Sequence, residues 1–316
     1  MYILIVNPIA GNGKSMKVYK KLQRHPLFKE KDCRTFFTKY EGHGTELARQ
    51  LSQMYGEKMK CFIIVGGDGT VHEVINGLTH HSSIHLSYIP AGSGNDFARG
   101  LHLKGKPVKL FEQIIQSPEY KPYWFGRFST KLKKPYNFKL FSSSMGFGFD
   151  AEVAKLVNRS RFKSVANRIG LGTLGYVISL LKQLFQFQPK NIDVILDGQF
   201  YSIKEAWMVT VASHPYFGGG MKIAPGAKNN PHDFHVVIVS QISKWKILAL
   251  FFTVFFGKHT KLKEVQVYQA RSIEIFADEG IYYHADGQTG RCTHCIIQKH
   301  ENKYDVHQGK IGSGNP

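Results

Sequence analysis

Two glycine-rich loops, each with an aspartate, have the residue types that bind phosphate groups and a divalent cation. The run GGDGT (residues 66–70) follows the apolar stretch CFIIV, and AGSGND (91–96) follows LSYIP. Glycines let backbone amides approach phosphate oxygens closely, and carboxylates are magnesium ligands. A single loop of this kind is usually a plain turn with Asp as the turn former. Two of them, placed alike, favour a site for a nucleotide with magnesium.

A third loop, NPIAGNGKS (residues 7–15), ends like a Walker A phosphate loop. That motif needs a glycine separated by four residues from its Gly-Lys-Ser triplet, and this chain has Pro8 there. Proline fixes φ and has no backbone N–H, so the Walker interpretation fails. The loop still offers free amides and Lys14 to an anion.

The elements that carry these loops are predicted by the alternation of apolar and helical stretches up to about residue 120. Strands are expected at 2–6, 35–38, 61–65 and 86–90, and helices at 16–23, 44–55, 71–78 and 95–101. This order predicts an α/β domain, a parallel sheet with helices on both faces. Ligands bind beyond the carboxyl ends of such strands, where all three loops lie.

From about residue 125 the pattern changes to strands without intervening helices. They are expected at 191–197, 207–213, 234–240, 265–270, 272–277 and 295–300, with helical insertions near 169–187 and 244–256. The sequence therefore predicts a second, mainly antiparallel β domain. We expect domains at 1–124 and 125–316, and the order allows the C-terminal segment to pack back on the first domain.

The charge of the chain points to a polyanionic partner. Forty-two Lys and Arg against 23 Asp and Glu give a net charge of +19. Nucleic acid, an anionic membrane surface and nucleotide phosphates all fit this charge, as does a merely solvated face. Basic residues alternate with aromatic ones at 121–139 and 155–168. No recognised nucleic-acid-binding module is visible, so we expect no nucleic-acid partner.

Cysteine use and hydropathy indicate a cytosolic chain. The start MYILIVNP has no basic region before a short apolar stretch, so no secretory signal is visible. Cys292 and Cys295 form a lone CxxC without a second ligand pair, which disfavours zinc. The longest apolar run, ILALFFTVFF (247–256), has half the roughly 20 residues that cross a bilayer. We expect it to form a buried or interfacial helix.

Several long motifs together resemble the diacylglycerol kinase catalytic family, in its bacterial lipid-kinase branch, which is similar to the sphingosine kinases. The motifs extend over nearly the whole chain: NPxxGxGK (7–14), GGDGTVHEVINGL (66–78), PAGSGNDFARGL (90–101), MGFGFDAEV (145–153), HPYFGGGMKIAPGAK (214–228), FFGKH (255–259) and HADGQ (284–288). The resemblance implies a nucleotide-binding first domain and a lipid-binding second domain, with ATP in the cleft between them.

The resemblance also implies roles for particular residues. Asp286 matches the general base that accepts the proton of the attacking hydroxyl, and Asp68 and Asp96 match the acids associated with Mg²⁺. Together with Lys14 and Gly66 of the loops described above, the positions expected to bind ATP are Asn7, Gly11, Gly67, Asp68, Gly69, Thr70, Gly92, Ser93, Gly94 and Asn95.

Two positions depart from the family pattern. The family usually has Asp-Gly-Glu where this chain has Asp286-Gly287-Gln288, which puts a catalytic role of the third residue in doubt. Many bacterial members also have a paired-acid turn after PGAK that binds a structural magnesium. Here the stretch is NNPHDFH (229–235), so that site is expected to be absent or rebuilt around Asp233.

The leading hypothesis is an ATP-dependent kinase of lipid metabolism that phosphorylates the hydroxyl of diacylglycerol or a related lipid in phospholipid biosynthesis. We expect a cytoplasmic protein, peripheral at the inner membrane surface, and the sequence leaves a homodimer open. One alternative is a catalytically degenerate member that binds nucleotide or lipid; another is an enzyme like the NAD kinases. The residues expected to contact anionic lipid are Lys131, Lys133, Lys134, Arg159, Arg161 and Lys163.

Overall fold

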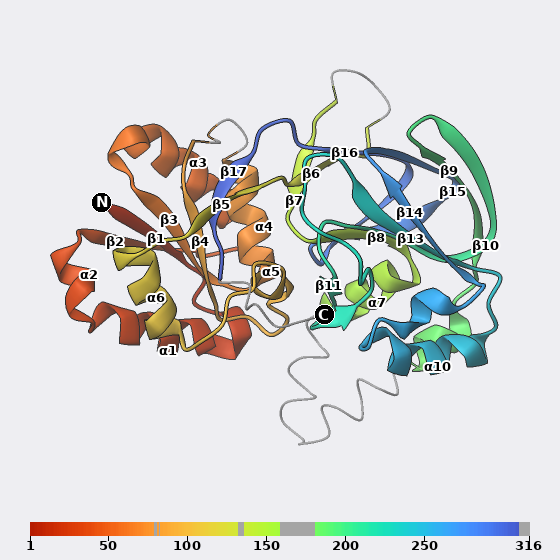
Figure 1. Ribbon diagram of the computed structural model, residues 1–316, viewed down its shortest axis with the longest axis horizontal. Coiled ribbons are helices and arrows are strands. Elements are labelled where there is room, and N and C mark those ends of the chain that lie inside the picture. Colours follow the sequence, from red (N-terminus) through yellow and green to blue (C-terminus); the bar gives the residue numbers. More distant parts are fainter. Residues whose placement is uncertain (79–80, 82, 132–135, 159–180, 310–316) are drawn as a thin grey trace.

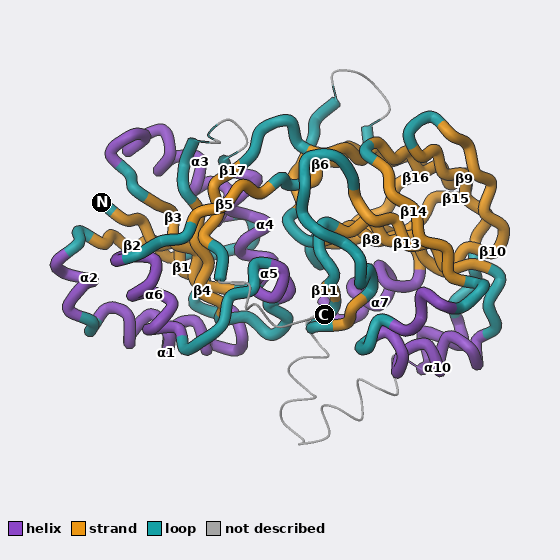
Figure 2. Tube along the Cα trace, viewed as in Figure 1, coloured by secondary structure: helices purple, strands orange, loops and turns teal. Residues whose placement is uncertain are grey.

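The computed structural model describes residues 1–78, 81, 83–131, 136–158 and 181–309, and it has two domains side by side (Figure 1). The first is a parallel sheet covered by helices on both faces, and the second is mainly antiparallel β structure with helices on one side (Figure 2). The predicted fold class is therefore confirmed. Of the six basic residues expected to contact lipid, only Lys131 lies within the described residues, and it is exposed.

The first sheet has the strand order β2-β1-β3-β4-β17-β5. Its first four strands are parallel, β17 is parallel to β4, and β5 is antiparallel to β17. The strands are β1 (Tyr2–Val6), β2 (Cys33–Phe37), β3 (Cys61–Gly66), β4 (Leu86–Pro90), β5 (Tyr120–Tyr123) and β17 (Tyr304–His307). The helices are α1 (Ala10–Gln23), α2 (Pro26–Glu30), α3 (His43–Tyr55), η1 (Gly56–Lys58), α4 (Asp68–Gly77), α5 (Asp96–Gly100) and α6 (Pro107–Gln116).

Strand β1 illustrates why this sheet is covered on both faces. Side chains alternate between the faces of a strand, and every residue of β1 is apolar and buried. Ile3 and Ile5 pack in one core cluster with residues of α3 and α4. Tyr2, Leu4 and Val6 pack in another with residues of α1, α2 and α6. A continuous apolar run of this kind is typical of a parallel strand between two helical layers.

The second domain is built on a nine-stranded sheet with the main order β14-β13-β10-β8-β15-β16-β6-β7. Both long strands, β10 and β15, pair with β8 along one part and with β9 along the other. The strands are β6 (Gly126–Ser129), β7 (Lys139–Phe141), β8 (Ser144–Gly148), β9 (Lys190–Leu196), β10 (Gln199–Ala212), β13 (Phe234–Ser240), β14 (Val265–Ala270), β15 (Ser272–Ala285) and β16 (Gln288–Lys299).

The helices of the second domain pack against one side of this sheet. They are α7 (Phe149–Asn158), α10 (Lys244–Val254) and the short η2 (Lys258–Lys261), with a small hairpin of β11 (Tyr216–Phe217) and β12 (Met221–Lys222). The expected helix at 244–256 is therefore present as α10, whereas most of the one expected near 169–187 lies outside the described residues. None of the described helices is long and apolar enough to cross a membrane.

The chain crosses between the domains twice. It leaves the first sheet after β5 at Tyr123 and returns at Tyr304, where β17 enters between β4 and β5. Because β17 forms the end of the described chain, residues from both ends of the sequence contribute to the first sheet. The two crossings lie side by side, because Tyr123 pairs with Tyr304, and they are at the edge of the sheet opposite the glycine loops.

Candidate active site

The two glycine loops meet at the carboxyl end of the first sheet. β3 and β4 are neighbours, so the loops that follow them lie side by side. A Cβ atom on Gly92 would lie 2.5 Å from the Cα of Gly67, and one on Gly67 would lie 3.2 Å from the Cα of Gly92. Because these backbones touch, only glycine fits at Gly92 without moving the facing loop. The loops at 66–70 and 91–96 therefore form one continuous surface of backbone atoms.

The loop after β1 joins the same surface. Asn7 Nδ2 donates a hydrogen bond to Thr70 Oγ1 over 3.1 Å. Gly11 has a left-handed φ of 58°, and a Cβ atom there would lie 2.2 Å from the carbonyl oxygen of Ala91. Gly11 therefore packs directly on the loop after β4. Lys14, which follows in α1, is exposed. The structure thus brings together residues from all three predicted loops.

Asn95 holds the second glycine loop in shape. It has a left-handed φ of 56°. Its Oδ1 accepts hydrogen bonds from Gly92 N over 2.9 Å and from Tyr88 OH over 3.1 Å. Its Nδ2 donates to Gly92 O over 3.0 Å. The side chain of Asn95 is therefore engaged within the loop, while Ser93 is exposed at the tip of the loop.

Asp68 begins helix α4 and lies among other acids. Its Oδ1 accepts a hydrogen bond from Phe97 N over 3.0 Å. Burial, together with the charges of Asp96 and Asp286, raises the pKa of Asp68 to about 6, against the lowering effect of the Phe97 amide. A carboxylate in this surrounding favours a nearby cation, since positive charge would stabilise its ionised form.

Asp96 links the two domains. Its Oδ1 accepts a hydrogen bond from Arg99 Nη1 over 2.9 Å, and its Oδ2 accepts one from Gly219 N in the second domain over 2.8 Å. A Cβ atom on Gly94 would lie 3.0 Å from Asp68 Oδ2 and 3.6 Å from Asp96 Oδ2. The two predicted metal-associated acids therefore flank the same point beside the glycine loop.

Asp286 is the most strongly anchored of the acids. It lies in the turn between β15 and β16 with a left-handed φ of 50°, and its side chain is fully buried. Its Oδ2 accepts hydrogen bonds from Ser142 N over 2.7 Å and from His72 over 3.1 Å. Its Oδ1 accepts from Ser143 N over 2.8 Å. Helix α4 of the first domain and the residues before β8 thus fix this carboxylate from two sides.

The surroundings of Asp286 keep it ionised. Burial acts to raise its pKa, but the hydrogen bond and the charge of His72 and the amides of Ser142 and Ser143 outweigh burial. The pKa of Asp286 therefore lies below its ordinary value. An ionised carboxylate only accepts hydrogen bonds, so His72 donates its Nδ1–H to it. Asp286 can orient a hydroxyl group and receive its proton, but it is a weak base.

Gln288 lies close to the start of α4. A Cβ atom on Gly69 would be 3.9 Å from Gln288 Nε2, so the side chain of Gln288 extends toward the first domain. On the other side of the turn, Asn158 Nδ2 donates to Gly287 O over 2.7 Å. The turn that carries Asp286 is therefore placed between α4 and α7.

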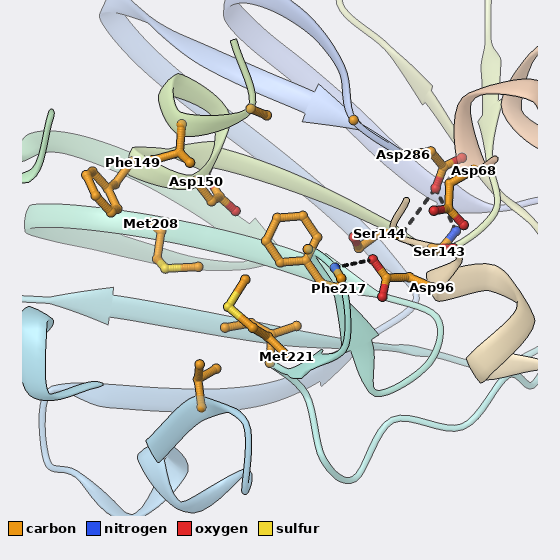
Figure 3. Close-up of a pocket in the computed structure, with 18 of the residues that line it drawn as sticks. Asp68, Asp96, Ser143, Ser144, Phe149, Asp150, Met208, Phe217, Met221 and Asp286 are labelled. Carbon is orange, nitrogen blue, oxygen red and sulfur yellow. Dashed lines mark hydrogen bonds between the residues drawn. The ribbon is translucent and has the colours of Figure 1, made fainter. Parts of the chain in front are cut away.

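A cavity of about 370 Å³ begins at these acids and extends into the second domain. Figure 3 shows Asp68, Asp96 and Asp286 gathered at one end and Phe149, Met208 and Met221 at the other. The apolar end is lined mainly by residues of one core cluster, Phe149, Trp207, Ile223, Val239, Ile247 and Val254. A ligand with one polar end and a long apolar part fits such a cavity.

Three polar side chains, those of Asp150, Thr210 and His284, lie close together near the wall of this cavity. Asp150 Oδ2 accepts a hydrogen bond from Thr210 Oγ1 over 3.1 Å and lies 3.5 Å from His284 Nε2. The His284 ring stacks on Phe217, with the ring centres 4.8 Å apart. These three side chains are buried within the second domain, and Asp150 lies in the first turn of helix α7.

The departures noted in the sequence have visible local structures. In the turn at 229–233, Asn230 Oδ1 accepts hydrogen bonds from the amides of His232 and Asp233, and Asn230 Nδ2 donates to Asp233 Oδ1. Asp233 is thus held within its own turn.

The two cysteines of the CxxC, Cys292 and Cys295, are buried free thiols. Within the described part of the chain, no three His, Cys, Asp or Glu side chains gather as a metal site.

Three contributors to the site escaped sequence reasoning: His72, the amides of Ser142 and Ser143, and the amide of Gly219. His72 had a detectable signal, because it lies four residues after Asp68 and thus on the same face of α4. The amides had none, since backbone groups leave no mark in residue type. The three glycines at 218–220 predict an unusual backbone conformation, but not which acid the amide of Gly219 contacts.

Two family models match the two parts of the chain. Residues 1–121 match the family model described as the diacylglycerol kinase catalytic domain. Residues 143–293 match the one described as the YegS C-terminal NAD kinase beta sandwich-like domain.

Relatives and solved structures extend over nearly the whole chain. A Bacillus subtilis (strain 168) protein with the name "Putative lipid kinase YtlR" is 34% identical, over 91% of this chain and 93% of its own. A diacylglycerol kinase of Mycobacterium tuberculosis is 26% identical, over 90% and 87%. The crystal structure of a Bacillus anthracis diacylglycerol kinase superposes with a TM-score of 0.71 at 22% identity, over 98% and 96%. Yeast NADH kinase shares the fold, with a TM-score of 0.56 at 10% identity, over 100% of this chain and 89% of its own.

Proposed function

Since this chain belongs to the diacylglycerol kinase family, we propose that it transfers the γ-phosphoryl group of ATP to the hydroxyl of diacylglycerol or a related lipid alcohol. The observation that carries this proposal is the continuous cavity from the carboxylates to the apolar wall of Phe149, Met208 and Met221. A lipid alcohol has a reactive hydroxyl at a polar end and apolar chains beyond it, which matches both ends of the cavity.

The nucleotide is placed by the three loops of the first domain. The backbone surface around Gly67 and Gly92 and the amino terminus of α4 offer amides to phosphate oxygens. Lys14, exposed beside this surface, is suited to contact the phosphates as a point charge. The phosphates would then lie next to Asp68, at the polar end of the cavity.

The acids of the site fit a magnesium ion bound together with the nucleotide. Asp68 and Asp96 flank one point, and Mg²⁺ usually takes one or two carboxylates, with phosphate oxygens and water completing its coordination. Burial is the main cause of the raised pKa of Asp68, and the negative charges of Asp96 and Asp286 add to it. When bound, the ion neutralises charge that develops on the transferred phosphoryl group.

Asp286 is suited to orient the acceptor hydroxyl and to take its proton. Phosphoryl transfer passes through a loose transition state that needs positioning and charge neutralisation more than a strong base. A carboxylate with a lowered pKa, held by His72 and by the amides of Ser142 and Ser143, meets that need. His72 is thereby a positioning residue that acts through Asp286.

We further propose that the protein acts in lipid metabolism, in the cytoplasm and at the inner membrane surface. Its acceptor lipid resides in a bilayer, and the net charge of +19 suits a surface rich in anionic headgroups. The lining of the cavity disfavours an activity like that of the NAD kinases, because a dinucleotide acceptor is polar over its whole length whereas this lining is mainly apolar.

A second candidate is a catalytically degenerate member of the family that binds nucleotide or lipid without transfer. Gln288 favours it, since an amide stands where the family usually has a carboxylate. The two functions differ in turnover, so an assay of transfer separates them directly.

The test is an acceptor panel with the purified full chain, labelled ATP and Mg²⁺. Diacylglycerol, a monoacylglycerol, a sphingoid base, glycerol and NAD are each supplied, with the lipids in mixed micelles. The proposal expects labelled phosphate on at least one lipid alcohol and none on glycerol or NAD. Transfer to NAD alone, or ATP binding without transfer to any acceptor, would contradict it.

A further inference from the structure

The end of the second domain carries a cluster of exposed aromatic side chains. Trp245, Phe255 and Phe256 expose 71%, 51% and 75% of their surface. Phe185, which is 43% exposed, packs edge-on against Trp245 with the ring centres 5.4 Å apart. Large aromatic groups gathered on a surface mark a site of interaction rather than a neutral face. We call these four residues the α10 aromatic cluster.

Helix α10 is apolar on two opposite sides. Trp245 and Ala249 are spaced by about one turn and are both exposed, and Phe256 is exposed in the turn that follows the helix. Ile247 and Val254 lie half a turn away, are buried, and line the cavity of the site. The helix is therefore one wall of the apolar cavity, and the exposed cluster lies on its outer side at Trp245 and in the turn after its end at Phe255 and Phe256.

The segment that carries α10 and the turn after it has charged side chains of positive sign only. Between residues 234 and 263 the sequence has no Asp or Glu, but it has five lysines. Lys258, Lys261 and Lys263 are exposed, while Lys246 forms an ion pair with Glu264 over 2.7 Å. Aromatic rings beside exposed lysines suit the headgroup region of an anionic bilayer, where Trp and Phe enter the interface and Lys contacts phosphate.

We propose that the α10 aromatic cluster, with Lys258, Lys261 and Lys263, is the surface by which this protein docks on an anionic lipid bilayer. The role of this surface in catalysis rests on the proposed function. Docking sets α10, which is one wall of the acceptor cavity, against the membrane that holds the acceptor lipid. Docking itself requires no nucleotide and no transfer. The proposed surface differs from the one expected from sequence, which consists of the basic residues at 131–134 and 159–163.

Trp245 supplies a direct probe of the contact. The chain has three tryptophans; Trp207 is 2% exposed, Trp124 is partly buried, and Trp245 is exposed. Vesicles of phosphatidylcholine and phosphatidylglycerol, with brominated acyl chains, quench tryptophans that enter the interface. The proposal expects a blue shift and quenching in the wild type, both lost in W245F, with binding kept by that variant.

Vesicle sedimentation without nucleotide tests the surface itself. W245S/F256S and, separately, K258E/K261E should bind phosphatidylglycerol vesicles at least tenfold more weakly than the wild type. Phe200→Ser is the matched control, because Phe200 is 61% exposed on β10, outside the cluster, and its loss should change nothing. Each variant is first checked for an unchanged thermal unfolding midpoint. Wild-type binding by both variants would overturn the proposal.

A second copy of the chain is the competing occupant of the cluster. If W245S/F256S converted a dimer to a monomer and left vesicle binding unchanged, the surface would be a subunit interface and the proposal would be wrong. Activity separates this proposal from the proposed function. On a short-chain lipid in solution W245S/F256S should match the wild type, and on vesicles it should fall. If the protein has no transfer activity but its vesicle binding depends on the cluster, the docking proposal is supported and the proposed kinase function is wrong.

Discussion

His72 in the first domain donates its Nδ1 proton to Oδ2 of Asp286 in the second domain, over 3.1 Å. Both side chains are almost or fully buried, so water cannot replace this hydrogen bond at low cost. The contact fixes the expected general base relative to helix α4, which begins in the glycine loop of the proposed nucleotide site. Helix α4 thus positions both Asp68, which is its first residue, and Asp286, through His72.

Replacement of His72 by Ala should move the pH dependence of turnover. Burial already acts to raise the pKa of Asp286, and His72 is the first of the groups that lower it. Without His72 the carboxylate becomes protonated at a higher pH, so the acidic limb of the kcat profile should shift upward. We expect kcat at neutral pH to fall by about tenfold, less than the roughly 10²- to 10⁴-fold effect of losing a general base, because Asp286 itself remains.

The matched control is His25→Ala, because His25 also pairs with an acid, Glu112, over 3.0 Å, but within the first domain. It should leave the profile unchanged. An unaltered acidic limb in the His72→Ala variant would show that the contact is merely structural.

Gln288→Glu tests whether the chain has lost a catalytic carboxylate. In an active enzyme adapted to the amide, the change adds a negative charge near α4, Asp68 and Asp286, and like charges raise the pKa of neighbouring carboxylates. We therefore expect kcat to stay the same or decrease, with Gln199→Glu on exposed β10 as the control. A large gain in kcat would indicate a degenerate site restored by the charge.

Asp68→Asn should stabilise the nucleotide-free protein at neutral pH. The folded pKa of Asp68 is raised to about 6 from 3.8, so the folded state binds more protons between these values and loses stability as pH rises through them. Asparagine removes this cost. The difference in unfolding midpoint between variant and wild type should grow from pH 4 to pH 7.

Asp32→Asn is the control for that series. Asp32 is exposed and has a left-handed φ of 48°, which Asn tolerates, so its replacement should show no such trend. Addition of Mg²⁺ and ATP should stabilise the wild type and not Asp68→Asn. Equal stabilisation of both would remove Asp68 from the proposed metal site.

Met208→Trp should shorten the acyl chains that the protein accepts. Met208 lines the apolar end of the cavity, and a larger ring takes up space that a chain would occupy. We expect KM for long-chain lipids to rise by about tenfold or more, with short-chain lipids little affected. Met54→Trp, at a position that is 68% exposed on α3, is the control. An equal loss for all chain lengths would place the lipid elsewhere.

The sheet of the first domain could be predicted because its signals are local. Apolar runs such as residues 2–6 and 61–65 have the length of buried strands, and the glycine loops follow them directly. Two parallel strands that are neighbours bring their loops together, so the contact between Gly67 and Gly92 follows from the pattern.

The rest of the site depends on contacts between distant parts of the chain. Asp286 is held by the amides of Ser142 and Ser143, about half the chain away, and Asp96 by the amide of Gly219. The order of the strands in the second domain decides which loops meet, and strand periodicity does not encode that order. The return of β17 between β4 and β5 is of the same kind.

The most direct measurement of the central claim is label transfer from ATP to a lipid by the wild type and by Asp286→Asn, side by side. The variant keeps the size of the side chain but removes the proton acceptor and leaves one buried N–H facing an amide. The account predicts labelled lipid phosphate with the wild type, a kcat about 10²- to 10⁴-fold lower with the variant, and nearly equal ATP binding. Equal turnover by both proteins, or no labelled lipid with the wild type, would contradict it.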